Sequence, residues 1–217
     1  MRAILLGACA RVDSQFKKLV KDLKIREKDL LIGVDGGTAI WVKLGFQPDI
    51  ALGDWDSLKD KKILDSVPHV TLPRDKDRSD LFFALSEAVR SGARELVCMG
   101  VTGGRPDHHL AALLDLAEFS ADVESLTAIA TDARTYFVSG KPTGSGLSLK
   151  LKKGQTISVF SLPTKAGKHA AGVRFEGLKF QVPNGTLNGS QGLSNVAARP
   201  HCKIGLTSGT LVVIVPC

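Results

Sequence analysis

The stretch PDIALGDWDSL, from Pro48 to Leu58, places two carboxylates two positions apart directly after a short apolar run. Residues 49–52 are expected to form a strand, and a glycine follows where this strand ends. At about 4 Å, two like charges repel by about 1 kcal/mol in water and about 4 kcal/mol at an effective dielectric constant of 20. A divalent cation would remove that repulsion, because hard metal ions bind carboxylate oxygens. Asp54 and Asp56 are therefore candidate metal ligands, although a lone pair of this kind is also typical of a solvated turn.

Three further polar clusters follow predicted strands: VDGGT at 34–38, PRDKDRSD at 73–80 and TGGRPDHH at 102–109. In an open α/β sheet, ligands bind beyond the carboxyl ends of the strands. Each cluster also has a simpler interpretation, because the paired glycines suit a tight turn and Asp80 or Asp107 could cap a helix. Four such clusters at strand ends together favour a binding site.

The charged residues of these clusters suit phosphate chemistry. Asp80 adds a third hard oxygen ligand to Asp54 and Asp56, and Mg²⁺ commonly combines one or two carboxylates with substrate phosphates. Lys76 and Arg105 could stabilise charge on a transferring phosphoryl group, although either could also be a solvated surface charge. We therefore expect a metal-dependent nucleotide site.

Glycines in two of the clusters would let the backbone approach a phosphate closely: Gly36, Gly37, Gly103 and Gly104. Helices predicted to start after Thr38 and Asp107 would favour a bound anion. The sequence contains neither a Walker loop, GxxxxGK[ST], nor the dinucleotide-binding pattern GxGxxG. A phosphate site here would therefore be of another type.

Composition limits the function classes. The chain has 217 residues, 43% hydrophobic content and a formal charge of +7, but its basic residues are scattered and aromatic residues are few. Nucleic-acid modules usually concentrate basic residues and interleave aromatic ones, so we expect no nucleic-acid partner. The four cysteines show no metal spacing, and no apolar run reaches the length of a membrane span. We expect a cytoplasmic protein that binds no membrane.

Hydrophobic periodicity divides the chain near residue 131. The first part alternates strand-like runs with helical patterns, with strands expected at 3–7, 30–34, 49–52, 69–72, 95–101 and 126–130. This alternation predicts a mostly parallel sheet with helices on both faces, a Rossmann-like α/β domain. The second part has short runs rich in β-formers at 147–154, 155–163, 173–182 and 210–216. These runs predict a second domain with antiparallel sheets.

The motifs DGG, PDIALGDWDS, KDRSD, GGRPDHH, GLKF and SN occur in this order along nearly the whole chain. In this combination the chain resembles the thiamine pyrophosphokinase family. The resemblance implies an α/β ATP-binding catalytic domain at 1–131 and a thiamine-binding β-sandwich at 132–217. It also implies transfer of the pyrophosphoryl group of ATP to the thiamine hydroxyl with Mg²⁺, giving thiamine diphosphate and AMP, in a homodimer whose active sites are shared between subunits.

Carried over by position, the resemblance implies that Asp54, Asp56 and Asp80 are the metal-binding and catalytic acids. Either Asp56 or Asp80 could accept the proton. The resemblance further implies that a set drawn from both domains binds nucleotide or thiamine: Asp35, Gly36, Gly37, Lys76, Ser79, Arg105, Asp107, Gly192, Ser194 and Asn195. Four positions depart from the usual pattern of the family: Ser79 for Thr, Ala112 for Asn, Glu176 for Thr and Phe180 for Trp or Tyr.

Two other functions are compatible with parts of the sequence. A non-catalytic protein could bind thiamine or a nucleotide, but it would have little need of three converging acids. A metal-dependent nucleotide-sugar transferase could use the same D-x-D motif, but this function explains neither the second acidic cluster nor the motifs of the second domain. The pyrophosphokinase interpretation accounts for all of them.

Overall fold

The computed structural model describes residues 1–141, 145–162 and 169–217. The chain forms two compact units, Met1–Thr131 and Asp132–Cys217. As predicted, the fold is mixed α/β with a mostly parallel sheet and antiparallel sheet structure. Pro163, at the end of one predicted β run, lies outside the described residues. Within the described ranges, no helix is long and apolar enough to cross a membrane.

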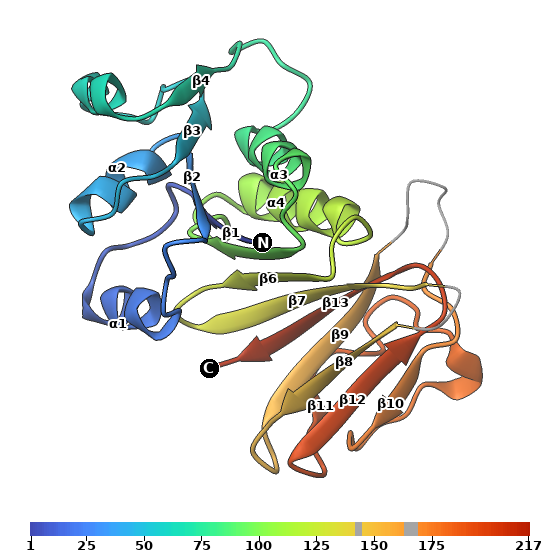
Figure 1. Cartoon of the computed structure of the whole chain (residues 1–217). Coiled ribbons are helices and arrows are strands. Elements are labelled where there is room, and N and C mark those ends of the chain that lie inside the picture. The colour runs from blue at the N-terminus through green and yellow to red at the C-terminus, as the bar shows by residue number, and fades with distance from the viewer. Residues whose placement is uncertain (142–144, 163–168) are drawn as a thin grey trace. The chain divides into compact units, whose positions relative to one another are not determined.

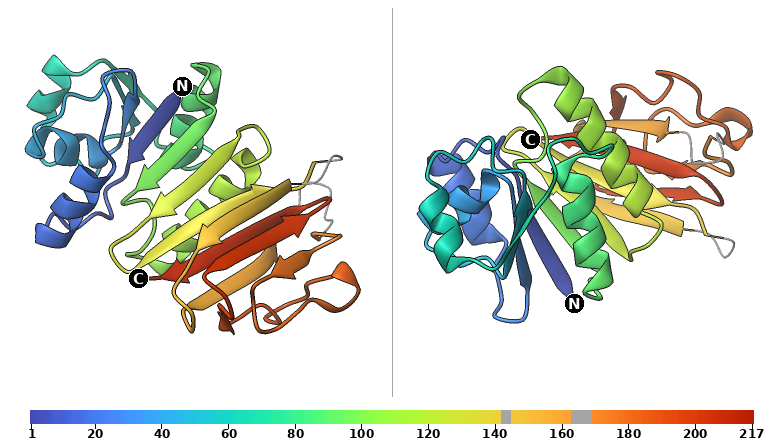
Figure 2. Two further views of the ribbon diagram at one scale, coloured as in Figure 1. Left: turned by 60° about the horizontal axis from the view of Figure 1, so that its bottom comes forward. Right: turned by 90° about the horizontal axis from the view of Figure 1, so that it is seen from above.

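The first unit is built on parallel strands in the order β6-β5-β1-β2-β3-β4 (Figure 1). All six strands lie within one or two residues of their predicted positions: β1 (Arg2–Leu6), β2 (Leu30–Val34), β3 (Ile50–Gly53), β4 (His69–Thr71), β5 (Glu95–Met99) and β6 (Ser125–Ile129). Most side chains of the inner strands are buried on both faces, as expected for a parallel sheet. Figure 2 shows β1, in blue, beside β5, in green.

Helices cover both faces of this parallel sheet (Figure 1). On one face, α1 (Ser14–Asp22) and α2 (Gly37–Lys43) pack Phe16 and Trp41 against Ile4 and Leu6 of β1. On the other face lie α3 (Asp80–Arg90) and α4 (Pro106–Phe119), and a short 3₁₀ helix, η1 (Lys61–Ser66), connects β3 to β4. This arrangement leaves the carboxyl ends of the strands, where the polar clusters begin, at one edge of the unit.

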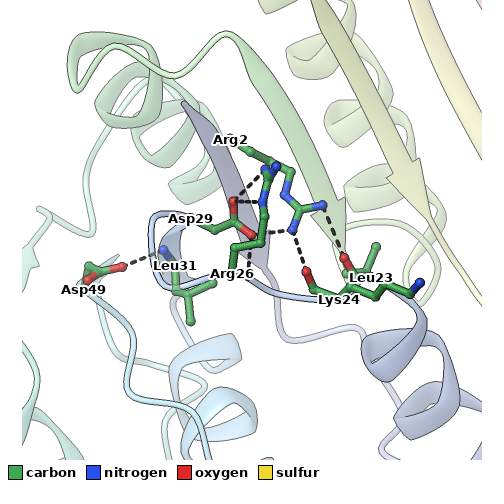
Figure 3. A network of polar contacts seen from close by, with 7 residues as sticks. All are labelled: Arg2, Leu23, Lys24, Arg26, Asp29, Leu31 and Asp49. Atoms are coloured by element: carbon green, nitrogen blue, oxygen red, sulfur yellow. Dashed lines mark hydrogen bonds and ion pairs between the residues drawn. The ribbon is translucent and has the colours of Figure 1, made fainter.

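A buried carboxylate ties the amino-terminal strand to the loop before β2 (Figure 3). The Asp29 side chain is fully buried, forms an ion pair with Arg2, and accepts a hydrogen bond of 2.8 Å from Arg26 Nη2. Arg2 also donates to the carbonyl oxygens of Leu23 and Lys24, each at 3.3 Å. Burial alone would raise the pKa of Asp29, but the hydrogen bonds from both arginines outweigh it and lower this pKa to about 2.

The second unit consists of antiparallel strands around one hydrophobic core. In its described part, one sheet has the order β7-β13-β9-β11 and the other has the order β10-β12-β8. Ile157 and Val213 of the first sheet share a core cluster with Phe175 and Ile204 of the second. The strands are β7 (Ala133–Ser139), β8 (Ser145–Lys150), β9 (Thr156–Leu162), β10 (Arg174–Glu176), β11 (Asn195–Val196), β12 (His201–Leu206) and β13 (Thr210–Pro216), and a short 3₁₀ helix, η2 (Pro183–Gly185), follows β10.

Candidate active site

A cavity of about 460 Å³ lies at the carboxyl ends of the strands in the first unit. It is lined by residues that follow β1, β2, β3 and β5, by the loop before α3, and by the starts of α3 and α4: Gly7, Ala8, Cys9, Val34, Asp35, Asp54, Asp56, Ser57, Arg74, Lys76, Arg78, Ser79, Asp80, Leu81, Gly100, Val101, His108, Ala111 and Ala112. Its lining combines four carboxylates with three basic side chains. A cavity of this composition suits a polyanion that brings a cation with it.

Asp35 is the most buried carboxylate of this cavity, with 9% of the residue exposed. Its Oδ2 is held by the Ser57 hydroxyl, whereas its Oδ1 is buried without a hydrogen-bond partner in the structure. The residue has a left-handed backbone, φ 48°, and its N–H donates to the carbonyl of Leu52 at 2.8 Å. Because left-handed backbone is costly for a residue with a side chain, the surrounding bonds must hold Asp35 in place.

The register of β2 and β3 brings Asp35 beside the D-x-D motif. Val34 pairs with Leu52, so the residues that follow each strand lie next to one another. A Cβ atom on Gly53 would lie 2.8 Å from the Asp35 Cα, so only glycine permits this approach. The result is a group of three carboxylates, Asp35, Asp54 and Asp56, whose nearest oxygens all lie within 4.8 Å of one another.

Trp55, between the two acids of the motif, anchors the turn. It is buried with 4% exposure, has φ 63°, and donates its indole N–H to Thr71 Oγ1 at 2.9 Å. The Asp56 N–H donates to Asp54 Oδ1 at 3.2 Å, which closes the turn. The middle residue therefore points into the core while the acids on both sides of it line the cavity.

Lys76 joins two of the acids. Its Nζ lies 2.9 Å from Asp54 Oδ2 and 3.2 Å from Asp80 Oδ1, and its side chain is 11% exposed. The hydrogen bond from Lys76 lowers the pKa of Asp54. Burial raises the pKa of Asp80, and Lys76 opposes this only in part. The ammonium group thus acts as a cation built into the acidic cluster.

The donor set fits a hard divalent cation. Three carboxylates converge, and one of them has a buried oxygen, Asp35 Oδ1, that lacks a partner and would gain one from a bound ion. The sequence predicted Asp54, Asp56 and Asp80 as the metal ligands. In the structure, the three carboxylates that converge are Asp35, Asp54 and Asp56, and Lys76 connects Asp80 to Asp54. Metal binding by Asp80 stays a prediction.

Part of the first unit is similar in sequence to known proteins. Residues 22–127 match the family described as thiamin pyrophosphokinase, catalytic domain. A curated relative, the thiamine pyrophosphokinase of Bacillus subtilis (strain 168), is 36% identical over 100 residues. This match covers 43% of the chain and 47% of the relative, so it spans about half the length of each. The α/β unit of this chain is thus similar to the catalytic domain of thiamin pyrophosphokinases over residues 22–127.

Solved structures of thiamine pyrophosphokinases share the whole fold. The enzyme from Bacillus subtilis has a TM-score of 0.76 at 23% identity and is covered over 99% of its length, with all of this chain covered. The enzyme from Geobacillus thermodenitrificans has a TM-score of 0.77 at 21% identity, covering 98% of its length and all of this chain. The Candida albicans enzyme has a TM-score of 0.71 at 14% identity, with 88% of it and 99% of this chain covered. At these sequence identities, the structural similarity shows a shared fold and nothing further.

Several residues assigned from the family resemblance lie outside the lining of this cavity. Arg105 and Asp107 are exposed and bind each other, with Arg105 Nη2 at 2.6 Å from Asp107 Oδ2. Gly36 donates its N–H to Ser57 Oγ at 3.2 Å. A Cβ atom on Gly37 would lie 1.8 Å from the carbonyl oxygen of residue 6. The close packing of α2 on β1 is therefore sufficient to explain why this residue is a glycine.

Three residues of the thiamine pyrophosphokinase resemblance lie in the second unit. Gly192 is packed against β9, because a Cβ atom there would lie 1.8 Å from the Val159 carbonyl oxygen. Ser194 is exposed and has a left-handed backbone, φ 55°. Asn195 is buried and lines a separate cavity of this unit.

Sequence reasoning missed one hydroxyl side chain and two basic side chains that line the cavity of the first unit: Ser57, Arg74 and Arg78. The hydroxyl of Ser57 binds Asp35 and also accepts the Gly36 N–H, so it orients the most buried acid. All three lie inside motifs that were singled out from the sequence, GDWDS and PRDKDRSD. Their positions in the sequence, close to the predicted acidic residues, could have identified them as candidates for the site.

Proposed function

We propose that this protein transfers the pyrophosphoryl group of ATP to the hydroxyl of thiamine, giving thiamine diphosphate and AMP. The observation that carries this proposal is the match to the thiamin pyrophosphokinase catalytic domain over the segment that holds the acidic cluster. The similarity to solved thiamine pyrophosphokinases over the whole chain supports it at the level of the fold. The whole activity remains a proposal because the curated match covers about half of each chain.

The residues of the cavity divide into two groups in this proposal. Asp35, Asp54 and Asp56 would hold Mg²⁺, which, when bound, neutralises phosphate oxygens and positions the chain of phosphates. The basic side chains Arg74, Lys76 and Arg78 line the same cavity and would attract the remaining phosphate charge. Both groups favour a triphosphate over an uncharged ligand.

The transfer requires one bond to form and one to break. The thiamine hydroxyl oxygen bonds to the β-phosphorus, and the bond from that phosphorus to the oxygen bridging the α- and β-phosphates breaks, so AMP leaves with that oxygen. The hydroxyl proton passes to a carboxylate of the cavity, for which Asp56 and Asp80 are the candidates. The chain thereby supplies charge, positioning and a proton acceptor.

The remaining inferences from the family resemblance stay predictions. They are Mg²⁺ as the metal, a homodimer with active sites shared between subunits, thiamine binding by the second unit, and a cytoplasmic location.

A single assay with purified protein tests the proposed reaction. The protein is incubated with ATP, thiamine and Mg²⁺, and AMP and thiamine diphosphate are separated by chromatography and quantified. We expect the two products to appear in equal amounts and to disappear when EDTA exceeds Mg²⁺. Formation of ADP in place of AMP, or no thiamine diphosphate, would overturn the proposal.

The Asp35→Asn variant tests the role of the acidic cluster. Removing this charge should lower kcat by about 100-fold or more, as usual when a charge-stabilising group leaves an active site. The matched control is Asp77→Asn, which removes an exposed carboxylate of the loop before α3 that does not line the cavity. Equal activity in both variants would exclude Asp35 from the site.

A further inference from the structure

The second unit contains its own cavity, of about 210 Å³. It is lined by residues of the segment that connects β10 to β11, together with one residue of each strand. Phe180 and Asn195 both line it, yet their exposures are opposite. Phe180 is 53% exposed, whereas Asn195 is 3% exposed. The aromatic ring is thus presented outward, and the amide is held inward.

Backbone groups use both ends of the Asn195 carboxamide. Its Oδ1 accepts the Phe180 N–H at 3.0 Å and the Val196 N–H at 2.8 Å. Its Nδ2 donates to the Phe180 carbonyl oxygen at 2.8 Å. Asn195 therefore holds the peptide groups on both sides of the Phe180 Cα, a bond pattern that neighbouring strands usually provide.

Ser194, the neighbour of Asn195, is placed differently. Its side chain is exposed, and its backbone N–H donates to Ser158 Oγ at 3.0 Å. Its left-handed backbone, φ 55°, turns the chain between the two residues. The two members of one sequence motif thus face different surroundings.

We propose that Asn195 is a positioning residue that fixes the backbone of Phe180, so that the Phe180 ring forms a wall of this cavity for the aromatic part of the acceptor. Asn195 would have to release buried peptide groups to reach a ligand, and an unpartnered buried peptide group is costly. In this proposal, exposed groups such as Ser194 make the direct polar contacts with the acceptor. This inference rests on the proposed function, because thiamine is the acceptor used to test it.

The first experiment measures hydrogen exchange at the Phe180 amide in the ligand-free protein by NMR. In Asn195→Ala the exchange should become at least about 10-fold faster, because the acceptor of this N–H is lost. Asn195→Asp keeps an acceptor oxygen but loses the donor to the Phe180 carbonyl, so it should give an intermediate rate. The matched control, Ser194→Ala, should leave the rate unchanged. Unchanged exchange in a folded Asn195→Ala protein would overturn the proposal.

The second experiment is a double-mutant cycle on kcat/KM for thiamine with Asn195→Ala and Phe180→Leu. If Asn195 acts through the ring, Asn195→Ala should cost about 10-fold or more in the wild-type background but under about 2-fold in the Phe180→Leu background. Equal costs in both backgrounds would indicate direct contact of Asn195 with the acceptor and overturn the proposal. A wild-type protein without thiamine turnover would reject the proposed function alone, because the exchange experiment decides the role of Asn195 independently.

Discussion

Lys76 reduces the electrostatic repulsion between the carboxylates of the cavity when no metal ion is bound. An ammonium within 3.2 Å of carboxylate oxygens on both Asp54 and Asp80 offsets repulsion that the partly buried position would otherwise strengthen. The same ammonium lies beside an oxygen that a divalent cation would bind. If Asp54 binds a metal ion as proposed, we expect Lys76 to compete with that ion for Asp54, and the phosphates of a bound triphosphate would offer the displaced ammonium a new partner.

The Lys76→Met variant tests this competition. Without nucleotide, its affinity for Mn²⁺ should rise by about tenfold, because a positive charge next to the site is lost; tenfold corresponds to about 1.4 kcal/mol. Calorimetric titration with Mn²⁺ measures the affinity without relying on turnover. The control is Lys61→Met, an exposed lysine that does not line the cavity. Equal or weaker Mn²⁺ binding in Lys76→Met would show that no competition exists.

At the scale of elements, a hydroxyl at the start of α3 forms a hydrogen bond to α4. Ser79 is the N-cap of α3 and accepts the Phe82 N–H at 3.1 Å, while its Oγ donates to Asp115 Oδ2 of α4 at 2.5 Å. Asp115 is buried, and burial raises its pKa. The next residue in the chain is Asp80, so this link also positions a carboxylate of the cavity.

Replacing Ser79 should therefore weaken the fold as well as the site. We expect Ser79→Ala to lower the free energy of unfolding by about 1–2 kcal/mol, because the cap is lost and a buried carboxylate loses its partner. Ser79→Thr keeps the hydroxyl and should remain within about 0.5 kcal/mol of the wild type. Urea denaturation measures both values. A Ser79→Ala protein as stable as Ser79→Thr would contradict the link.

Much of this element structure could be predicted from local patterns. The strands and helices of the first unit follow the apolar periodicity closely, since burial on a sheet or helix face leaves a repeat in the sequence. The interpretation of Asp80 and Asp107 as helix caps was wrong, because Ser79 and Arg105 occupy the cap positions. In the second unit, β7 and β12 were missed, although the residues of β12 alternate between exposed and buried.

The composition of the acidic cluster could not be predicted in the same way. Asp35 and Asp54 are 19 positions apart, and they meet only because Val34 pairs with Leu52 and Gly53 lacks a side chain. Strand register is set by the packing of whole strands, so it leaves no local signal. For Lys76, the sequence left open phosphoryl-charge stabilisation or a solvated surface charge, and it gave no signal for the position between two carboxylates that the structure shows.

At the scale of the whole molecule, stability at low pH depends on the buried carboxylate of Asp29 and the two arginines that bind it. The pKa of Asp29 falls from 3.8 to about 2 on folding, so its contribution is fully present above about pH 4. As pH falls from about 4 to about 2, the Asp29 carboxylate takes up a proton in the unfolded chain but stays ionised in the folded protein, so unfolding becomes more favourable and this stabilisation is lost. The shift corresponds to about 2 kcal/mol.

The Asp29→Asn variant should show this dependence directly. Its free energy of unfolding should be lower than that of the wild type at pH 6, and the difference should shrink between pH 4 and pH 2 as the wild type loses the charge. Denaturant titrations at several pH values provide the measurement. The control is Asp22→Asn, which changes an exposed carboxylate at the end of α1. A difference that stays constant over this pH range would argue against the assignment.

The central place of β1 has a consequence for how the chain is made. Among the described strands, β1 leaves the ribosome before the others, and its partner β2 follows soon afterwards. Its other neighbour is β5, and Arg2 pairs with Glu95, 93 residues later. Until Met99 has been synthesised, the nascent chain therefore exposes one unpaired, apolar edge of its innermost strand, the kind of surface that promotes aggregation. We therefore expect the nascent chain to be most prone to aggregation while the segment from β2 to β5 is being made.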